Sequence, residues 1–169
     1  MTYDKDFVSE IVGKVMEEYK KTASGDSVPV GISNRHIHLS KDDLETLFGK
    51  GYELTPLKDL SQPGQFLANE RVTVAGPKGE FSNVAVLGPE RPAAQVEVSL
   101  TDGRHLGITP PVRLSGDVEN TPGAVLIGPK GKVELQQGVV AAQRHIHMTP
   151  EGAARMGVTD GHTVKLKAY

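Results

Sequence analysis

An Arg-His-Ile-His tetrapeptide occurs twice in this chain, at residues 35–38 and again at residues 144–147. The chain has six histidines, and four of them are in these two pairs: His36, His38, His145 and His147. An apolar, β-rich run precedes each pair, and residues i and i+2 of a strand point to the same face. We therefore expect the imidazoles of each pair to project together as ligands of a divalent transition metal, with zinc the best match. The alternative is a set of structural histidines that are hydrogen-bonded within a barrel.

A carboxylate is the third candidate ligand. Glu97 lies between Val96 and Val98 in an alternating run, so its side chain is expected to face away from both valines. A carboxylate in that position requires water, a polar partner or a metal. Residues 93–101 also echo residues 141–149, with Glu97 at the position of His145. We predict that His36, His38 and Glu97 form a three-ligand zinc set that leaves a position open for water or substrate. The alternative is that Glu97 is a solvent-facing strand residue.

Composition limits which elements can carry these ligands. The 169 residues include 19 glycines and 11 prolines, which favour many short strands joined by tight turns. Cysteine is absent, so the metal site must use histidine and carboxylate, and the absence of thiols fits a reducing, cytoplasmic location. The net charge of −2 and the absence of a basic run argue against nucleic-acid binding. No apolar stretch approaches the roughly 20 residues of a membrane span, and no secretory signal is recognisable.

The pattern from residue 28 onward is mainly β. Ser40 is expected to cap a short helix, and Thr149 followed by Pro150 is expected to begin another. A short helical stretch is also expected after the run that contains Glu97. Alternating apolar runs between turn signals predict strands at residues 71–75, 81–87, 95–100, 124–127, 132–135, 138–142 and 163–166.

The internal echo predicts two related small β-barrel domains with short capping helices. We place the first barrel at residues 28–118, with an approximate boundary at which strands can be shared, and the second at residues 119–169. Residues 1–27 are predicted to be a separate region, in which an amphipathic helix over residues 1–22 precedes a soft linker. That helix either packs on the barrels or serves as a docking peptide.

Five motifs together resemble a known family. They lie at residues 30–40, 60–65, 95–99, 114–117 and 143–148, and in this order they are highly specific. The chain is similar, from about Val28 to its end, to PduL-type phosphate propanoyltransferases, which are phosphotransacylases. The resemblance implies two β-barrels with a dinuclear zinc site between them and coenzyme A beside it. The implied reaction is the reversible conversion of acyl-CoA and phosphate into acyl phosphate and CoA.

The resemblance also assigns roles to residues. It places His36, His38 and Glu97 on one zinc and His145 and His147 on the second. Arg91 matches the phosphate-binding arginine of the family, and Ser115 matches a serine near the reacting groups. The family continues past this point with further strands and one more zinc-binding histidine. We therefore expect the second barrel and the second zinc site to be incomplete in this chain, which bears on its activity.

The expected partners are acyl-CoA and phosphate, with no nucleic acid and no membrane. We also expect a homodimer, and docking of residues 1–22 to a bacterial microcompartment, in whose lumen the protein would lie. Two other functions compete with this one. A cupin-like metal enzyme is suggested by the spacing of His145, His147, Glu151 and Gly157, although the first histidine pair lacks this pattern. A non-catalytic metal-binding module is the other alternative. A TIM-barrel hydrolase is excluded because the chain is too short.

Overall fold

The structure is a computed structural model that describes Val28 and residues 31–167. It divides into two compact units. One runs from Ser33 to His145, and the other contains the described residues up to Ile32 and from Ile146 onward. The expected helix over residues 1–22 lies outside the described residues.

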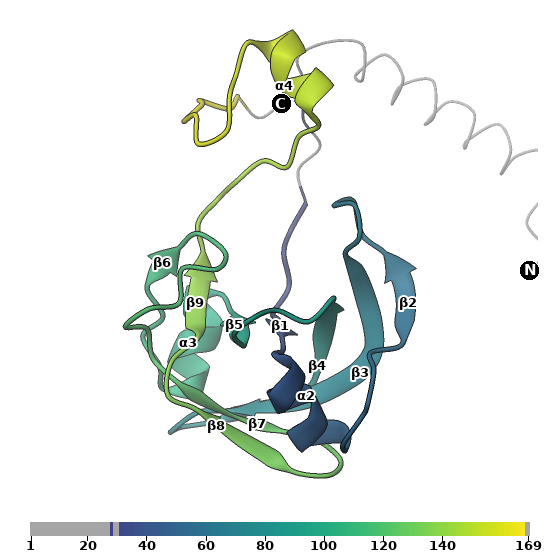
Figure 1. Cartoon of the computed structure of the whole chain (residues 1–169). Coiled ribbons are helices and arrows are strands. Elements are labelled where there is room, and N and C mark those ends of the chain that lie inside the picture. Colours follow the sequence, from purple (N-terminus) through teal and green to yellow (C-terminus); the bar gives the residue numbers. More distant parts are fainter. Residues whose placement is uncertain (1–27, 29–30, 168–169) are drawn as a thin grey trace, which may run out of the picture. The chain divides into compact units, whose positions relative to one another are not determined.

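The unit of Ser33–His145 is built on a curved mixed sheet (Figure 1). Among the described residues, the strand order is β6-β9-β5-β1-β4-β3-β7-β8, and β2 pairs with β3 beside this path. The strands are β1 (His36–His38), β2 (Pro56–Asp59), β3 (Phe66–Ala75), β4 (Glu80–Gly88), β5 (Gln95–Glu97), β6 (Val112–Arg113), β7 (Ala124–Ile127), β8 (Lys132–Leu135) and β9 (Val139–Ala142). The predicted strands over residues 124–127 and 132–135 are confirmed with these same bounds.

Strand β1 lies in the middle of this order. It pairs in parallel with β4 and antiparallel with β5, and this second register sets His36 opposite Glu97. The strands on the two sides of the expected domain boundary at residues 118 and 119 share the sheet, because β7 pairs with β3 and β9 pairs with β5. The mainly β character is therefore confirmed, whereas two related barrels stay a prediction.

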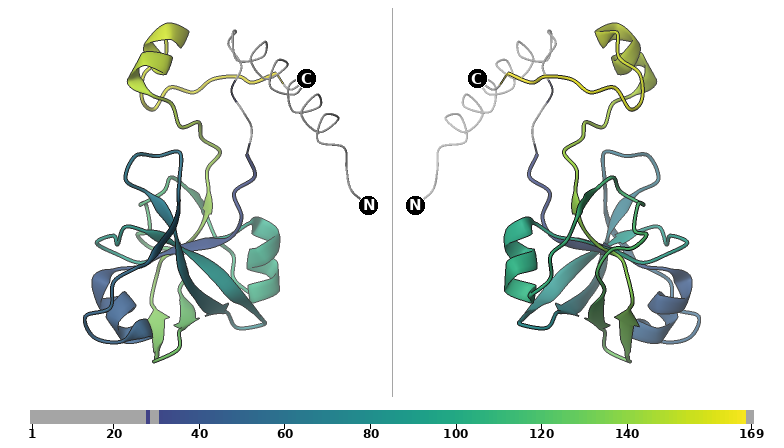
Figure 2. Two further views of the ribbon diagram at one scale, coloured as in Figure 1. Left: turned by 90° about the vertical axis from the view of Figure 1, so that its right-hand side faces the viewer. Right: turned by 90° about the vertical axis from the view of Figure 1, so that its left-hand side faces the viewer.

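Two short helices flank the sheet on opposite sides (Figure 2). Helix α2 (Lys41–Phe48) begins where predicted, with the Ser40 hydroxyl accepting a hydrogen bond from the Asp43 amide, 3.2 Å away. Helix α3 (Leu100–Leu106) begins with a capping box between Ser99 and Asp102. The expected strand over residues 95–100 was wrong at its end, since this cap turns the chain into a helix directly after β5.

Apolar residues from the sheet and both helices form one core. Helix α2 contributes Leu44 and Leu47, and α3 contributes Leu106, all with no exposed surface. Burying each of these side chains stabilises the fold by roughly 1.5–3 kcal/mol. The strands contribute Ile37, Val72, Val74, Val84, Val86, Val96, Leu126 and Val139.

The other unit contains helix α4 (Pro150–Met156), which begins as predicted with Thr149 as its cap and Pro150 in its first turn. The predicted strand over residues 163–166 was wrong. These residues are exposed, and the described part of this unit holds no strand with which their backbone could pair. Nor do residues 143–149 form a strand, because β9 ends at Ala142 before the second histidine pair. In the described part of the chain, no helix is long and apolar enough to cross a membrane.

Candidate metal centre and substrate pocket

The pairing of β1 with β5 brings His36, His38 and Glu97 together. One potential ligand atom from each side chain lies within 4.8 Å of the others. The Nε2 atom of His36 is 3.4 Å from Oε2 of Glu97, and the two imidazoles meet edge to face with their ring centres 5.2 Å apart. These three residues could supply three of the four ligands of a tetrahedral divalent cation. We call them the His-Glu cluster.

A backbone carbonyl orients the His36 ring. Its Nδ1 donates to the carbonyl oxygen of Asn34 at 2.9 Å, so its Nε2 faces Glu97. Metal-binding histidines commonly donate their second ring nitrogen in this way, which sets the tautomer and the direction of the ligating nitrogen. His145 repeats the arrangement, because its Nδ1 lies 2.7 Å from the carbonyl of Gln143, also two residues earlier.

The electrostatics of the cluster favour metal-binding forms of two of its three groups. Burial, together with the positive charges of Arg91 and His36, lowers the pKa of His38 to about 4, so His38 is neutral near pH 7. Burial raises the pKa of Glu97, but hydrogen bonds from His36 and Ser115 outweigh it and hold the pKa at about 2. Burial also lowers the pKa of His36, and its contacts with Glu97 and Asn34 raise it to a net value above the usual one.

The cluster fits a zinc ion on its own chemistry. His38 is only 3% exposed, and its Nδ1 is buried with no hydrogen-bond partner among the described residues. Leaving a buried polar nitrogen without a partner costs free energy of folding. The unpaired nitrogen of His38 therefore favours a bound ion at this site. Two imidazoles and one carboxylate are also a ligand set of catalytic zinc sites, in which the fourth position stays open.

A network of hydrogen bonds joins the cluster to Arg91. Ser115 donates to Oε1 of Glu97 at 3.1 Å and accepts from Nη1 of Arg91 at 3.0 Å. Gln95 donates to the same Glu97 oxygen at 2.6 Å and to the Ser115 hydroxyl at 3.1 Å. Arg91 comes from the loop between β4 and β5, and Ser115 from the turn after β6, so four segments of the chain meet here.

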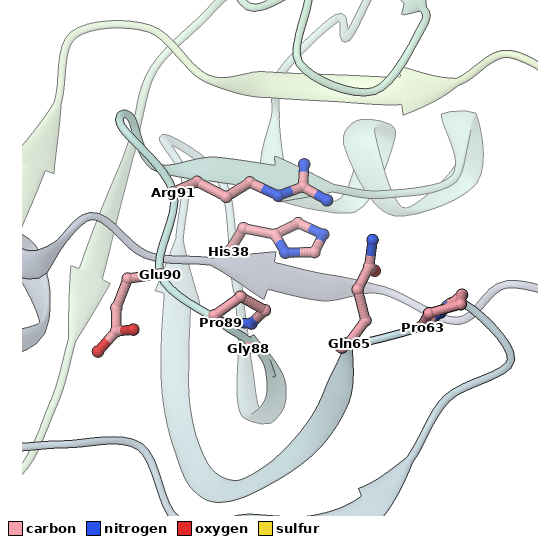
Figure 3. Close-up of a pocket in the computed structure, with 8 residues that line it drawn as sticks. His38, Pro63, Gln65, Gly88, Pro89, Glu90 and Arg91 are labelled. Carbon is pink, nitrogen blue, oxygen red and sulfur yellow. The ribbon is translucent and has the colours of Figure 1, made fainter.

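A cavity of about 360 Å³ opens beside the cluster (Figure 3). Its wall includes His38 and Arg91, and on the other side the loop that joins β2 to β3, with Gln65. Figure 3 shows the guanidinium of Arg91 and the amide of Gln65 reaching toward the His38 ring, whereas the carboxylate of Glu90 points away. The cavity therefore has a fixed positive group and an imidazole facing the same space.

A second cavity of about 390 Å³ reaches the cluster at Glu97. Its walls are largely apolar, with Val98, Leu100 and Val112 among them, and Arg144 lies at the same cavity. The side chains of Leu100 and Val112 are more than half exposed. The His-Glu cluster is thus reached by one cavity at His38 and by a second cavity at Glu97.

The structure brings together five of the seven residues singled out from sequence: His36, His38, Glu97, Arg91 and Ser115. His145 ends one compact unit and His147 lies in the other, so their role as ligands stays a prediction. Sequence reasoning missed Gln95 and Gln65. Gln95 is two residues before Glu97 on the same strand, and that spacing could have indicated a shared face.

Comparison with known proteins gives a consistent result. The family model described as phosphate propanoyltransferase matches residues 29–169. A phosphate propanoyltransferase of Thermotoga maritima is 56% identical over 156 residues, which are 92% of this chain and 74% of that protein. One of Leptotrichia buccalis is 54% identical over 167 residues, which are 98% of this chain and 79% of that protein. One of Enterococcus faecalis is 50% identical over 162 residues, which are 96% of this chain and 74% of that protein.

Proposed function

Because this chain belongs to the phosphate propanoyltransferase family, we propose that it transfers a propanoyl or similar short acyl group reversibly between coenzyme A and inorganic phosphate. The observation that carries the proposal is that Arg91 and His38, which belongs to the His-Glu cluster, line the same cavity. In one direction, a phosphate oxygen forms a bond to the thioester carbonyl carbon while the carbon–sulfur bond breaks. CoA leaves as a thiolate and takes up a proton from solvent.

We propose zinc as the cofactor, held by His36, His38 and Glu97. The buried, unpaired nitrogen of His38 and the orientation of the His36 ring support this assignment. When bound, zinc would polarise the thioester carbonyl and so favour attack on it. For a second zinc we propose His145 and His147. The Nδ1 atom of His145 contacts the carbonyl two residues earlier, as that of His36 does, and this supports the proposal.

Arg91 is proposed to bind phosphate. A guanidinium is permanently charged and presents paired N–H donors that match two oxygens of one phosphate. One of its nitrogens is held by Ser115, which leaves the others for the cavity. Binding phosphate in a fixed direction next to the cluster would supply much of the rate acceleration, because attack then needs no further ordering.

Ser115 is proposed to position its neighbours rather than act as a nucleophile. A hydroxyl has one proton and two lone pairs. Here the proton is donated to Glu97, and the lone pairs face Arg91 and Gln95. Ser115 therefore links the phosphate-binding arginine to the carboxylate of the cluster. The cavity at Glu97 is proposed to take the acyl end of the thioester, because it offers Val98, Leu100 and Val112 to a hydrocarbon chain.

The test is release of CoA thiol from propanoyl-CoA by the full chain, measured with and without phosphate. We expect the release to depend on phosphate and to yield propanoyl phosphate. The double variant His36→Ala with His38→Ala should lose this activity and roughly one zinc per chain, measured by mass spectrometry of the metal. His105→Ala is the matched control, because its ring lies against that of Phe81, outside the cluster. CoA release at the same rate with and without phosphate would contradict the proposal, and so would unchanged zinc content in the double variant.

We also propose that residues 1–22 dock the protein to a shell or core protein of a bacterial microcompartment and so place it in the lumen. The apolar stripe in their sequence and the soft linker after it support this. A homodimer is proposed as the assembly state. Light scattering on the purified chain would measure its mass in solution, and a monomer at working concentration would contradict the dimer.

A further inference from the structure

Gln95 is an uncharged polar residue buried at the heart of the site. Its side chain is 1% exposed, in a strand whose other residues, Val96 and Glu97, are also buried. Burying an amide without partners costs free energy, and an apolar residue of similar size would avoid that cost. The position of the amide therefore calls for an explanation in terms of its partners.

Every polar atom of this amide has a partner at the site. Its Oε1 accepts from the Gly116 amide at 2.7 Å, and a backbone N–H can only donate, so the oxygen must face Gly116. Its Nε2 then faces the other way and has two protons to donate. One goes to Oε1 of Glu97 at 2.6 Å and the other to the Ser115 hydroxyl at 3.1 Å.

These bonds determine which carboxylate oxygen of Glu97 is free for a cation. Oε1 accepts from both Gln95 and Ser115, whereas Oε2 faces Nε2 of His36 at 3.4 Å. The two donors hold the carboxylate in one rotation about its terminal bond. Hydrogen-bonded carboxylate ligands of this kind bind a metal with an orientation set before the ion arrives.

The same amide also acts on the loop that carries Ser115. The bond to Gly116 holds the turn after β6, and the bond to Ser115 sets its hydroxyl so that Arg91 can donate to it. One side chain therefore contacts the carboxylate of the cluster and the serine that anchors Arg91. Gln95 itself lines neither of the two cavities.

We propose that Gln95 is a positioning residue that sets both the Glu97 carboxylate for zinc and, through Ser115, the Arg91 guanidinium for phosphate. This inference deepens the proposed function and rests on it for the phosphate half. The zinc half can be measured without any turnover.

The test uses the full chain with Gln95→Met, which keeps the length of the side chain and removes its hydrogen bonds. Gln95→Asn is the second variant, because it keeps the amide and shortens its reach by one methylene. Thr121→Val is the matched control: Thr121 is 5% exposed and makes two hydrogen bonds, with Val118 and Gly138. All three are compared for thermal stability, for zinc affinity by competition with a chelator, and for the KM of phosphate and of propanoyl-CoA.

We expect both Gln95 variants to bind zinc about 10- to 100-fold more weakly, as is typical when a partner of a metal ligand is removed. The KM of phosphate should rise more than that of propanoyl-CoA. In the double variant Gln95→Met with Ser115→Ala, the phosphate KM relative to wild type should rise by less than the product of the two single-variant increases. Both residues act on Arg91 through the same series of hydrogen bonds. Thr121→Val should lose stability but keep wild-type zinc affinity and the wild-type ratio of the two KM values.

Either of two results would overturn the inference. One is wild-type zinc affinity in both Gln95 variants, and the other is a pair of KM values that change in the same proportion as in Thr121→Val. If Gln95→Met does not fold, Gln95→Asn decides between these outcomes. A wild-type chain with no phosphate-dependent CoA release would instead contradict the proposed function, and weaker zinc binding in the Gln95 variants would then still support the placement of Glu97.

Discussion

Arg91 is the residue whose replacement should separate the two substrates. We expect Arg91→Ala to raise the KM of phosphate far more than that of propanoyl-CoA, because only phosphate would lose its charged hydrogen bonds. Such bonds are worth about 1.5–3 kcal/mol, or roughly ten- to a hundredfold in binding. Arg91→Lys should restore little, since an ammonium lacks the planar pair of donors. Steady-state kinetics measures both constants, with Arg104→Ala on the exposed surface of α3 as the control. Equal losses for both substrates would mark Arg91 as structural.

His36 should make zinc binding depend on pH. Zinc binds the unprotonated imidazole, and contact with Glu97 raises the pKa of His36 in the metal-free protein. Below that pKa zinc must displace one proton, so affinity should rise up to about tenfold per pH unit and level off above it. His38 and Glu97 contribute no proton near neutral pH, because their pKa values are about 4 and about 2.

Chelator competition between about pH 6 and pH 8 measures this dependence around the usual histidine range. The variant His145→Ala with His147→Ala serves as the background, so that only the His-Glu cluster is observed. Zinc affinity that does not change across this range would show that His36 is already unprotonated in the metal-free protein.

At the scale of elements, a glycine in helix α3 allows the helix to pack closely against the segment that follows it. Gly103 lies inside the helix, where alanine is ordinarily favoured by about 1 kcal/mol. A Cβ atom on Gly103 would lie 2.5 Å from Cδ of Pro110 and 2.9 Å from the carbonyl of Ile108. We therefore expect Gly103→Ala to destabilise the protein by about 1–3 kcal/mol in urea unfolding, against helix propensity.

The buried glycine of α4 provides the comparison. A Cβ atom on Gly152 would meet the Met148 side chain at 3.0 Å, and that flexible chain can move. Gly152→Ala should therefore cost nothing or stabilise slightly. A stabilising effect of Gly103→Ala would show that the backbone between Ile108 and Pro110 can shift enough to accommodate the added Cβ atom.

On the scale of the whole molecule, the unit of Ser33–His145 has a core of its own, drawn from its sheet and from α2 and α3. We expect deletion of residues 1–26 to leave its melting temperature and zinc content unchanged, because the deletion removes none of these core residues. Fusing residues 1–22 to a fluorescent protein should direct it to microcompartments. A fall of several degrees in the melting temperature, comparable to a loss of about 1 kcal/mol, would defeat the docking role.

Much of this protein follows from local rules. The turn signals and alternation around β7 and β8, and the caps at Ser40 and Thr149, act between residues a few positions apart, so the sequence alone determined them. The spacing of His36 and His38 belongs to the same class, because alternation in a strand needs no knowledge of its neighbours. The internal echo and the family motifs added Glu97 to this pair.

Pairing between distant segments decided the rest. The β1–β5 register sets Glu97 across from His36, and the turn after β6 brings Ser115 to Arg91 from 24 positions away. The proposed positioning role of Gln95 depends on both the β1–β5 pairing and the approach of Ser115 to Arg91. The strand predicted at residues 163–166 failed for the same reason, since a strand needs a partner for its backbone hydrogen bonds. Such partners come from tertiary structure, because the free energy of one segment depends on where another segment lies.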